Sequence, residues 1–546
     1  MLKIFLLIAL PFVISSAAFP YISSDSKLLS SSSSDVAEVF SCCSCSDSVD
    51  DMPKDTCSNT YSTVKIGELP QMTEAEAVKT LEGAVEAWNG GMGAWPQMSS
   101  EDRLQAIERV VSKLLSKRTE MVNALMYEIG KNYKDAESEV DRTVKFIRES
   151  IEELRKGYHV QRTTIGSTLA YIKRAAIGVI LALGPANYPL NETYAMIIPA
   201  LLTGNVVVVK IPAVGGLVHL LTLEAFASEL PPNTISFVSG GGRKTCPPMM
   251  KTGKVDGLAF IGGSKAADDL ITSHPEPHRL KVFSQLEAKN MAIFLDDVFD
   301  DEKALDEALD ASISGSLSYN GQRCTALKLL FVPSSKKEAF SSRFQEKVSN
   351  LRVGFPWVGM EDRSAASQIT PLPNKKRTAY MQELIEDARG KGAKIVGGEI
   401  VGGDDSTLMI PAVVSGVKKG MKLWEEEQFG PVVAVSWYDD LDELYSYAKD
   451  GRYAQQVSIF TTTADSALPV LVDKFSSIFG KININVAAGR SPDNLAFSGR
   501  RSSAMGTMSI RDSLNAFTTE TVIATKSVGQ NDKIFDDVLE ASSFAK

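Results

Sequence analysis

The sequence predicts an α/β fold with parallel sheets, and three observations lead to this expectation. Buried, strand-like apolar runs alternate with helical stretches from residue 177 onward, and this alternation is typical of βαβ units. Long stretches with apolar residues at helical spacing precede the first of these strands. The chain has 546 residues, of which 44% are hydrophobic and 23% are charged, so it is a globular chain large enough for two or three domains.

The N-terminal part of the globular sequence is predicted to be helical. Thr73 and Glu76 form a capping-box pattern before a helix that runs to about Trp88. Ser99 begins a second helix, and a long one follows over about residues 134–156. Residues 160–176 then alternate as a strand does, with Gly166 in the middle, which predicts a β-hairpin.

The following elements predict two successive α/β units. The first is Rossmann-like, with strands at 178–183, 205–210, 234–238 and 257–261. The second has strands at 291–295 and 327–332, and helices at 303–317 and 336–351. Residues 518–524 form a strand-like tail that is able to pair with another element or another subunit.

Composition narrows the range of partners. The formal net charge is -9, so a general nucleic-acid binder is not expected, although a local basic pocket remains compatible with it. Four of the six cysteines lie in a Ser/Asp-rich N-terminal stretch, and only Cys246 and Cys324 fall in the globular part, which is not a disulfide scaffold. The four histidines are scattered, so we expect no metal site.

The N-terminus resembles a targeting sequence. The apolar run from Ile4 to Ile14 is too short to span a membrane and suits a signal peptide over residues 1–18. Residues 19–65 are rich in serine, and we expect them to be disordered. A signal peptide followed by Ala-Phe-Pro resembles the two-part plastid address of algae with secondary plastids, although the acidic residues of this stretch are unusual for a transit segment. The alternative is the secretory pathway, and in either case the mature protein is not expected to be embedded in a membrane.

The stretch Ser318–Ala326 holds the residue around which we interpret the chain. Its sequence is Ser-Tyr-Asn-Gly-Gln-Arg-Cys-Thr-Ala, between a run of small residues and an apolar strand. A thiolate is a nucleophile, and a neighbouring cation such as Arg323 lowers the pKa of a thiol. A lone cysteine is more often a small buried apolar residue, so Cys324 needs support from the rest of the chain.

This stretch resembles the nucleophile motif of the aldehyde dehydrogenase superfamily, and Gly-Gln-Arg-Cys-Thr-Ala is most similar to its non-phosphorylating glyceraldehyde-3-phosphate dehydrogenase branch. The resemblance covers about residues 66–528. It implies a Rossmann-like cofactor-binding domain, an α/β catalytic domain and a small β oligomerisation arm in a homo-dimer or homo-tetramer. The expected boundaries are 66–159 and 177–286 for the cofactor domain, 287–480 for the catalytic domain, and 160–176 with 505–528 for the arm.

Asn187 is the second catalytic candidate. It lies in Pro-Ala-Asn-Tyr-Pro, after the first buried strand, where a side-chain amide can donate to a developing oxyanion. Taken alone, this string is more typical of a turn. The resemblance assigns Asn187 to an oxyanion hole together with the backbone N–H of Cys324.

The resemblance also implies a nicotinamide cofactor. Lys210 would contact its adenosine ribose or 2′-phosphate, and Ala213, where NAD-preferring relatives often carry an acid, favours NADP over NAD. A helix N-terminus suits a pyrophosphate, and Phe-Ile-Gly-Gly-Ser is the matching turn. The remaining cofactor contacts implied by the family motifs are Gly263, Ser264, Glu427 and Phe429.

Three arginines suggest the kind of substrate. Arg490 precedes Ser-Pro-Asp, and with Arg142 and Arg323 it matches the phosphate-binding arginines of the non-phosphorylating branch. The resemblance also implies that Tyr188 lies beside the substrate. Arginine binds phosphate through a planar bidentate fork, so the three residues together would suit a small phosphorylated aldehyde, although each alone is more typical of a protein surface.

One position departs from the family. Gln285 stands where the general-base glutamate is expected, and glutamine does not accept a proton at neutral pH. Residues two apart in a strand share a face, so Glu287 could point the same way. Three hypotheses remain open: oxidation of glyceraldehyde 3-phosphate to 3-phosphoglycerate with Glu287 or another carboxylate as base, transfer of the acyl group to coenzyme A, or an impaired nucleotide-binding relative.

Overall fold

The computed structural model describes residues 66–403, 406–464 and 467–545 in full, and the backbone of four N-terminal strands. These strands are β1 (Val36–Phe40), β2 (Ser44–Cys45), β3 (Tyr61–Ser62) and β4 (Lys65–Pro70). The expected signal peptide lies outside the described residues. Within the segment expected to be disordered, β1 instead pairs antiparallel with β4. The run Val-Ala-Glu-Val-Phe is prone to form a strand, and the edge of β4 offers its backbone groups partners.

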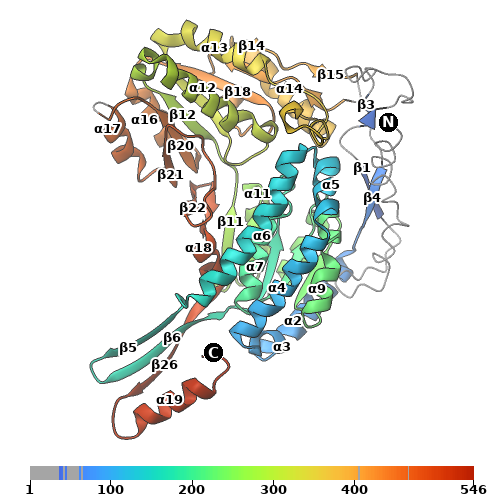
Figure 1. Cartoon of the computed structure of the whole chain (residues 1–546), viewed down its shortest axis with the longest axis vertical. Helices are drawn as coiled ribbons and strands as arrows, with labels where there is room; N and C mark the ends of the chain where they lie inside the picture. The colour runs from blue at the N-terminus through green and yellow to red at the C-terminus, as the bar shows by residue number, and fades with distance from the viewer. Residues whose placement is uncertain are drawn as a thin grey trace.

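A six-stranded sheet forms the core of the first body (Figure 1). Its order is β24-β11-β10-β7-β8-β9, and every pairing is parallel except that of β24 with β11. The strands are β7 (Val179–Leu183), β8 (Val206–Lys210), β9 (Ile235–Val238), β10 (Gly257–Ile261), β11 (Lys281–Gln285) and β24 (Ala504–Met505). Near-continuous apolar runs such as Val206–Lys210 are buried on both faces, as parallel sheets require.

Helices cover this sheet. The capping box at Thr73 and Glu76 is present at the start of α2, and Ser99 caps α4. The helices of this body are α2 (Glu74–Trp88), α3 (Ala94–Gln97), α4 (Ser100–Ser116), α5 (Arg118–Ile129), α6 (Tyr133–Arg155), α7 (Asn191–Leu202), α8 (Leu217–Leu220), α9 (Leu223–Glu229), α10 (Gly242–Lys251), α11 (Ser264–Ser273) and α18 (Ile510–Ala516). Their apolar faces join one continuous core with the sheet.

A seven-stranded sheet forms the second body, with the order β14-β17-β18-β13-β12-β20-β21. Its strands are β12 (Asn290–Phe294), β13 (Leu327–Pro333), β14 (Lys394–Val396), β17 (Ala412–Ser415), β18 (Val432–Tyr438), β20 (Gln456–Phe460) and β21 (Lys481–Ile484). Its helices are α12 (Glu302–Leu317), α13 (Lys337–Ser349), α14 (Lys375–Gly390), α15 (Lys422–Glu425), α16 (Leu441–Asp450) and α17 (Ala467–Phe475). Short paired strands complete the chain: β15 (Ile400–Val401), β16 (Leu408–Met409), β19 (Tyr453–Ala454), β22 (Phe497–Ser498), β23 (Arg500–Arg501) and β25 (Thr507–Met508).

Two expected boundaries shift in the structure. The second sheet continues past residue 480, because β21 pairs with β20. Residues 505–517, expected in the arm, belong instead to the first body, because Met508, Ile510 and Leu514 are buried in its core. The apolar spacing of this short helix gives no sign of which body it packs against.

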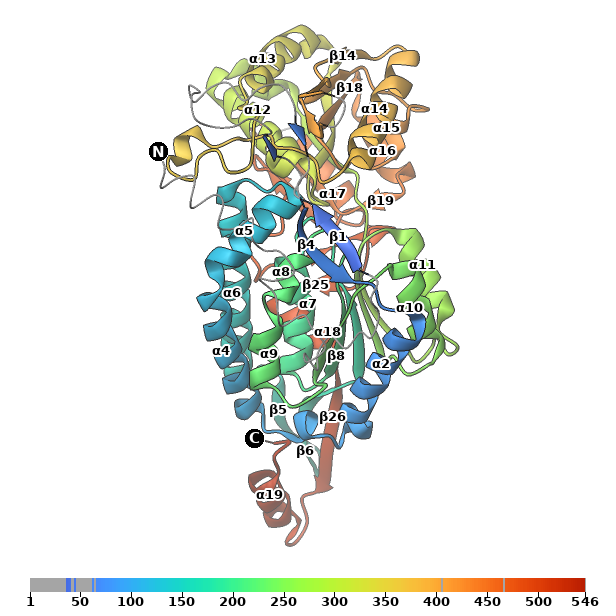
Figure 2. The same cartoon turned by 90° about the vertical axis from the view of Figure 1, so that its right-hand side faces the viewer.

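The expected arm is a three-stranded antiparallel sheet that projects from the first body (Figures 1 and 2). The predicted hairpin is confirmed as β5 (Val160–Ile165) and β6 (Thr168–Ala176), and β26 (Thr518–Lys526) pairs along β6. Helix α19 (Asn531–Ala541), which the sequence analysis did not predict, packs Phe535 against Leu169 and Tyr171.

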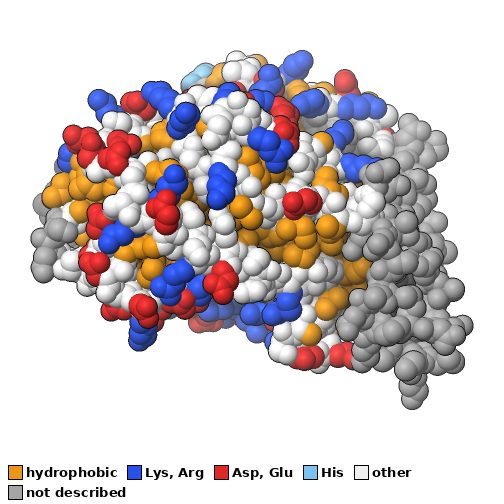
Figure 3. All heavy atoms as spheres, turned by 90° about the horizontal axis from the view of Figure 1, so that it is seen from above, with side chains coloured by type: hydrophobic (Ala, Val, Ile, Leu, Met, Phe, Trp, Pro, Cys, Tyr) orange, Lys and Arg blue, Asp and Glu red, His pale blue; other side chains and the backbone are white. Residues whose placement is uncertain are grey.

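The outer surface mixes charges of both signs. In Figure 3, which views the molecule from the end that carries the second body, basic and acidic side chains are interspersed over the described face. In the fully described ranges, no helix combines the length and hydropathy that a membrane span needs. The same ranges contain no cluster of metal-ligating side chains.

Candidate active site

A cavity of about 900 Å³ lies between the two bodies and gathers most of the predicted site residues. Residues from both bodies line it, so it exists only once they have packed together. The predicted residues in its lining are Arg142, Asn187, Tyr188, Gly263, Gln285, Glu287, Arg323, Cys324, Glu427, Phe429 and Arg490. Lys210 and Ser264 are not among the lining residues.

The loop that carries Cys324 has a constrained backbone. Tyr319, Asn320 and Gly321 all have positive φ values, of 49°, 55° and 68°. A Cβ on Gly321 would lie 2.7 Å from two backbone carbonyl oxygens, so glycine is required there. Beyond this turn, Asn290 Nδ2 donates to the carbonyl oxygen of Cys324 at 2.7 Å and holds that residue in position.

The surroundings of Cys324 keep its thiol protonated. Burial raises the pKa of Cys324 to about 12, and the carboxylates of Glu192 and Glu427 add to this effect. Arg323 does not act as the activating cation that the sequence suggested. Its Nη2 donates instead to the carbonyl oxygen of Gly315 at 2.7 Å, because the turn directs the side chain back toward α12.

Asn187 lies against the nucleophile loop. Its Nδ2 donates to the carbonyl oxygen of Gln322 at 2.7 Å. A side-chain amide has two N–H groups, so a second donor remains for an oxyanion. The structure therefore brings the two predicted elements of the oxyanion hole to adjacent segments.

A buried ion pair that the sequence analysis missed supports Asn187. Lys131 pairs with Glu139, and both side chains are fully buried. Lys131 also donates to the carbonyl oxygen of Asn187 at 2.9 Å and lies 3.5 Å from the centre of the Tyr188 ring. Glu139 accepts from the backbone N–H of Leu190 at 3.0 Å. The pair thus holds the backbone of the loop between β7 and α7.

Gln285 stands at the position expected for the general base, and the nearby Glu287 carboxylate is bound to another element. Gln285 ends β11, and its Nε2 donates to the carbonyl oxygen of Gly506 at 3.3 Å. The Glu287 carboxylate accepts from the backbone N–H of Ser264 at 2.8 Å, at the start of α11. Gln285 and Glu287 line the same cavity, as expected of side chains that point the same way, although β11 itself ends at Gln285.

Glu427 and Phe429, the two predicted nicotinamide contacts, line the same cavity. Glu427 accepts from the backbone N–H of Ala288 at 3.2 Å. Burial raises the pKa of Glu427 to about 7, while the ammonium of Lys328, 3.8 Å away, acts in the opposite direction. Lys210 is buried outside the cavity, where its Nζ donates to the carbonyl oxygen of Ile211.

Two of the three predicted arginines converge on one carboxylate. Arg490 Nε lies 2.9 Å from Asp493, and Arg142 Nη2 lies 3.3 Å from the same carboxylate. Arg490 Nη1 also pairs with Glu192 at 2.8 Å. Arg323 lines the same cavity. The cavity therefore holds an arginine-rich region that is partly neutralised by its own carboxylates.

Glu192 is the site residue that the sequence analysis missed. It lies in the first turn of α7, lines the cavity and raises the pKa of the Cys324 thiol. The signal that could have found it is its place in the first turn of the helix that follows the parallel strand β7, at the edge where α/β folds build their sites.

The fold and this site define the class of protein. A model of the aldehyde dehydrogenase family matches residues 50–523, and the chain belongs to this family. The expected fold and family are thereby confirmed.

Particular relatives are similar over most of their length. The NADP-dependent glyceraldehyde-3-phosphate dehydrogenase of Streptococcus equinus is 30% identical, over 83% of this chain and 92% of the relative. The protein of that name from Pisum sativum is 29% identical, over 82% and 86%. A 3-sulfolactaldehyde dehydrogenase of Priestia aryabhattai is 26% identical, over 85% and 93%.

A solved structure matches the fold closely. The NADP-dependent glyceraldehyde-3-phosphate dehydrogenase from Bacillus halodurans C-125, complexed with NADP, has a TM-score of 0.78 at 28% identity. The match covers 91% of this chain and 96% of that chain.

Proposed function

We propose that this aldehyde dehydrogenase oxidises glyceraldehyde 3-phosphate to 3-phosphoglycerate with NADP, with NAD as the alternative cofactor. The observation that carries the proposal is that Cys324, Asn187 and the three arginines line one cavity. The relatives from Streptococcus equinus and Pisum sativum, which are similar over most of the chain, are named NADP-dependent glyceraldehyde-3-phosphate dehydrogenase. An arginine-rich site beside a thiol suits a small phosphorylated aldehyde.

The residues present fit the nicotinamide half of the cofactor. Glu427 would accept from its ribose hydroxyls and Phe429 would pack beside its ring, and both line the cavity that contains Cys324. The pyrophosphate would lie at the N-terminus of α11, after Gly263. The carboxylate of Glu287 now uses the Ser264 N–H there, so it has to move before a phosphate can bind.

The proposed chemistry uses the chain's own side chains in order. The Cys324 thiol gives its proton to water as its sulfur bonds to the aldehyde carbon, and the carbonyl double bond opens to an oxyanion. Asn187 Nδ2 and the Cys324 N–H donate to this oxyanion. The bound nicotinamide supplies the hydride acceptor. The resulting thioester is then broken by water, whose oxygen bonds to the acyl carbon while the sulfur leaves and recovers a proton.

Glu192 is the proposed proton acceptor for that water. Gln285 does not accept a proton, and Glu287 is bound to α11. Glu427 is assigned to the ribose, which leaves Glu192 among the carboxylates that act on the thiol. Binding of the substrate phosphate to Arg490 would release Glu192 from its ion pair.

A second candidate is an impaired relative that binds nucleotide without turnover. Gln285 at the base position, and a thiol whose pKa is raised to about 12, favour it. The two candidates predict different time courses of NADPH formation. Transfer of the acyl group to coenzyme A predicts a third.

The test is NADPH formation by the full chain with glyceraldehyde 3-phosphate and without inorganic phosphate. We expect steady turnover, which Cys324→Ala abolishes and Gln285→Glu increases. A single burst of NADPH equal to the enzyme concentration would indicate the impaired relative, and turnover that requires coenzyme A would indicate acyl transfer. Wild type matching Cys324→Ala would refute catalysis by this thiol.

We also propose delivery to a plastid, on the basis of residues 1–18 and 19–65. A plastid offers the reducing surroundings that a free catalytic thiol needs. A fluorescent fusion of residues 1–65 should accumulate in plastids of an alga with secondary plastids. Secretion of the fusion into the medium would contradict the proposal.

A further inference from the structure

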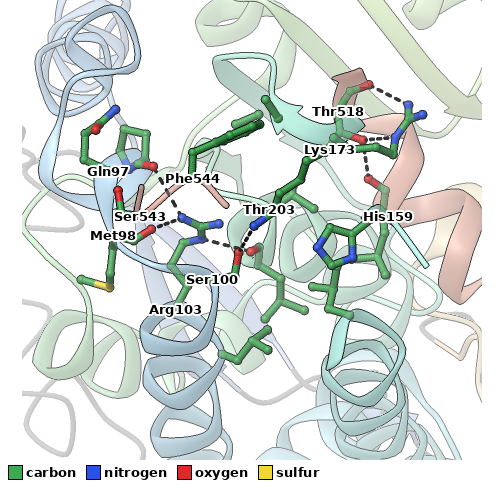
Figure 4. Close-up of a pocket in the computed structure, with 18 of the residues that line it drawn as sticks. Gln97, Met98, Ser100, Arg103, His159, Lys173, Thr203, Thr518, Ser543 and Phe544 are labelled. Atoms are coloured by element: carbon green, nitrogen blue, oxygen red, sulfur yellow. Dashed lines mark hydrogen bonds between the residues drawn. The ribbon is translucent and has the colours of Figure 1, made fainter. Parts of the chain in front are cut away.

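A second cavity, of about 310 Å³, lies at the base of the arm, away from the site described above. Figure 4 shows side chains from α4, from β6 and from the segment after α19 directed into it. Four of its lining residues carry basic side chains: Arg103, His159, Lys173 and Arg174. None of the side chains that line it is a carboxylate.

Lys173 is the least compensated of these groups. It is 4% exposed, and the one hydrogen bond that the described structure shows for its ammonium is to Ser100 Oγ, at 3.2 Å. Burial lowers the pKa of Lys173 to about 8, and the nearby charge of Arg103 acts in the same direction. A buried cation is costly unless it is paired.

Arg103 adds a second buried charge without an ionic partner in the described structure. Its guanidinium donates to the backbone carbonyl oxygens of Leu202, at 3.1 Å, and Met98. These contacts satisfy N–H groups but do not neutralise the charge. Arg174, in contrast, pairs with Glu520 on β26 at 3.3 Å.

The start of α4 faces the same cavity. Ser100 is the first residue of this 17-residue helix, and Arg103 lies in its first turn. The N-terminus of a helix carries a partial positive charge and favours anions. Glu101 and Asp102 in the same first turn offset part of this charge, so the positive potential of the cavity comes mainly from Lys173 and Arg103.

We propose that this cavity binds a small oxyanion of the phosphate class, held by Lys173, Arg103 and Ser100. The volume accommodates inorganic phosphate and leaves room for a small phosphate ester. The Phe544 ring lies 5.6 Å from Lys173 Nζ and covers the site from the C-terminal side. Occupancy would therefore hold the segment after α19 against the arm and the first body.

The test is titration of the full chain with inorganic phosphate. Calorimetry measures the binding, and the melting temperature measures the stabilisation. Sodium chloride of equal ionic strength is the reference. All proteins in the test carry Arg490→Ala, which should weaken binding of phosphate in the main cavity. We expect saturable binding and a rise in melting temperature of a few degrees, both lost in Lys173→Met. Lys145→Met, which removes a lysine that is 70% exposed, should bind phosphate as the Arg490→Ala protein alone does.

Two further variants keep the test decisive. Lys173→Arg preserves the charge and should retain binding, whereas Ser100→Ala should weaken it several-fold. Repeating the titration with glycerol 3-phosphate distinguishes an ester from the free ion, by which of them binds more tightly. Equal phosphate binding by the Lys173→Met and Lys145→Met proteins would overturn the proposal. Absence of binding by the Arg490→Ala protein alone would also overturn it.

Discussion

The thiol of Cys324 and the carboxylate of Glu192 line one cavity, and the carboxylate has opposite effects on the two proposed steps. The negative charge of Glu192 raises the pKa of the thiol, and so reduces the fraction of thiolate at neutral pH. The same carboxylate is the proposed acceptor of a proton in thioester hydrolysis. Its removal should therefore change the two steps in opposite directions.

Glu192→Gln should make Cys324 more reactive and the enzyme less active. Loss of the negative charge lowers the thiol pKa, so alkylation by iodoacetamide at pH 8 should accelerate, up to about tenfold for one unit of pKa. Steady-state NADPH formation should fall by about 10²-fold or more if Glu192 assists the water. Glu224→Gln, on the neighbouring helix α9, is the control. Unchanged alkylation in Glu192→Gln would contradict the electrostatic argument.

At the scale of single elements, the end of β11 determines where Glu287 points. The strand stops at Gln285, and in the irregular segment that follows, the Glu287 carboxylate accepts from the first N–H of α11. A carboxylate at a helix N-terminus is itself favourable. It also occupies the position where a pyrophosphate is expected to bind.

Glu287→Gln should therefore tighten NADP binding. The substitution removes a negative charge from the expected phosphate position, and we expect the dissociation constant to fall by a factor of about 5 to 10, close to 1 kcal/mol. Fluorescence titration of NADPH measures this directly. Glu426→Gln, which removes a carboxylate from the same cavity without touching α11, is the control. Weaker binding in Glu287→Gln would show that this carboxylate contributes to the cofactor site.

The loop between β7 and α7 depends on the buried pair of Lys131 and Glu139. Lys131→Met leaves the Glu139 carboxylate buried without its ionic partner, which costs about 3–5 kcal/mol in comparable cases. We expect urea denaturation to show a loss of this size in the free energy of unfolding. The double variant Lys131→Met with Glu139→Gln should recover part of it. An additive loss in the double variant would contradict the pairing.

For the whole molecule, the arm offers two open strand edges for contact with another chain. Its sheet has the order β26-β6-β5, so β26 and β5 are both edge strands. One face packs on α19 through Ile523, whereas Val522 on the opposite side is 55% exposed. An open strand edge with exposed apolar side chains favours pairing with another chain.

Val522→Asp should lower the oligomeric state. A charge on this exposed face opposes burial against a second arm, so native mass measured by light scattering should shift from dimer or tetramer toward monomer. Thr521→Asp places a charge on the neighbouring position of the same strand and is the control. A monomeric wild-type protein would show that the arm has another use.

The sequence by itself determined the local elements and the family. The capping box at Thr73, the alternation at 160–176 and the buried run Val206–Lys210 are each decided by neighbouring residues, so they could be predicted. The string around Cys324 carries enough specific residues to indicate the aldehyde dehydrogenase family. The replacement at Gln285 was likewise visible without coordinates.

Only the tertiary structure decided what surrounds those residues. The contacts of Glu192 with Arg490 and of Glu287 with α11 join segments whose spacing in the sequence carries no information about distance. The cavity at the arm has the same origin, since Lys173 comes from β6 and Ser100 from α4. Local propensity decides a strand or a helix, but charge pairing and burial depend on which elements the folded core brings together.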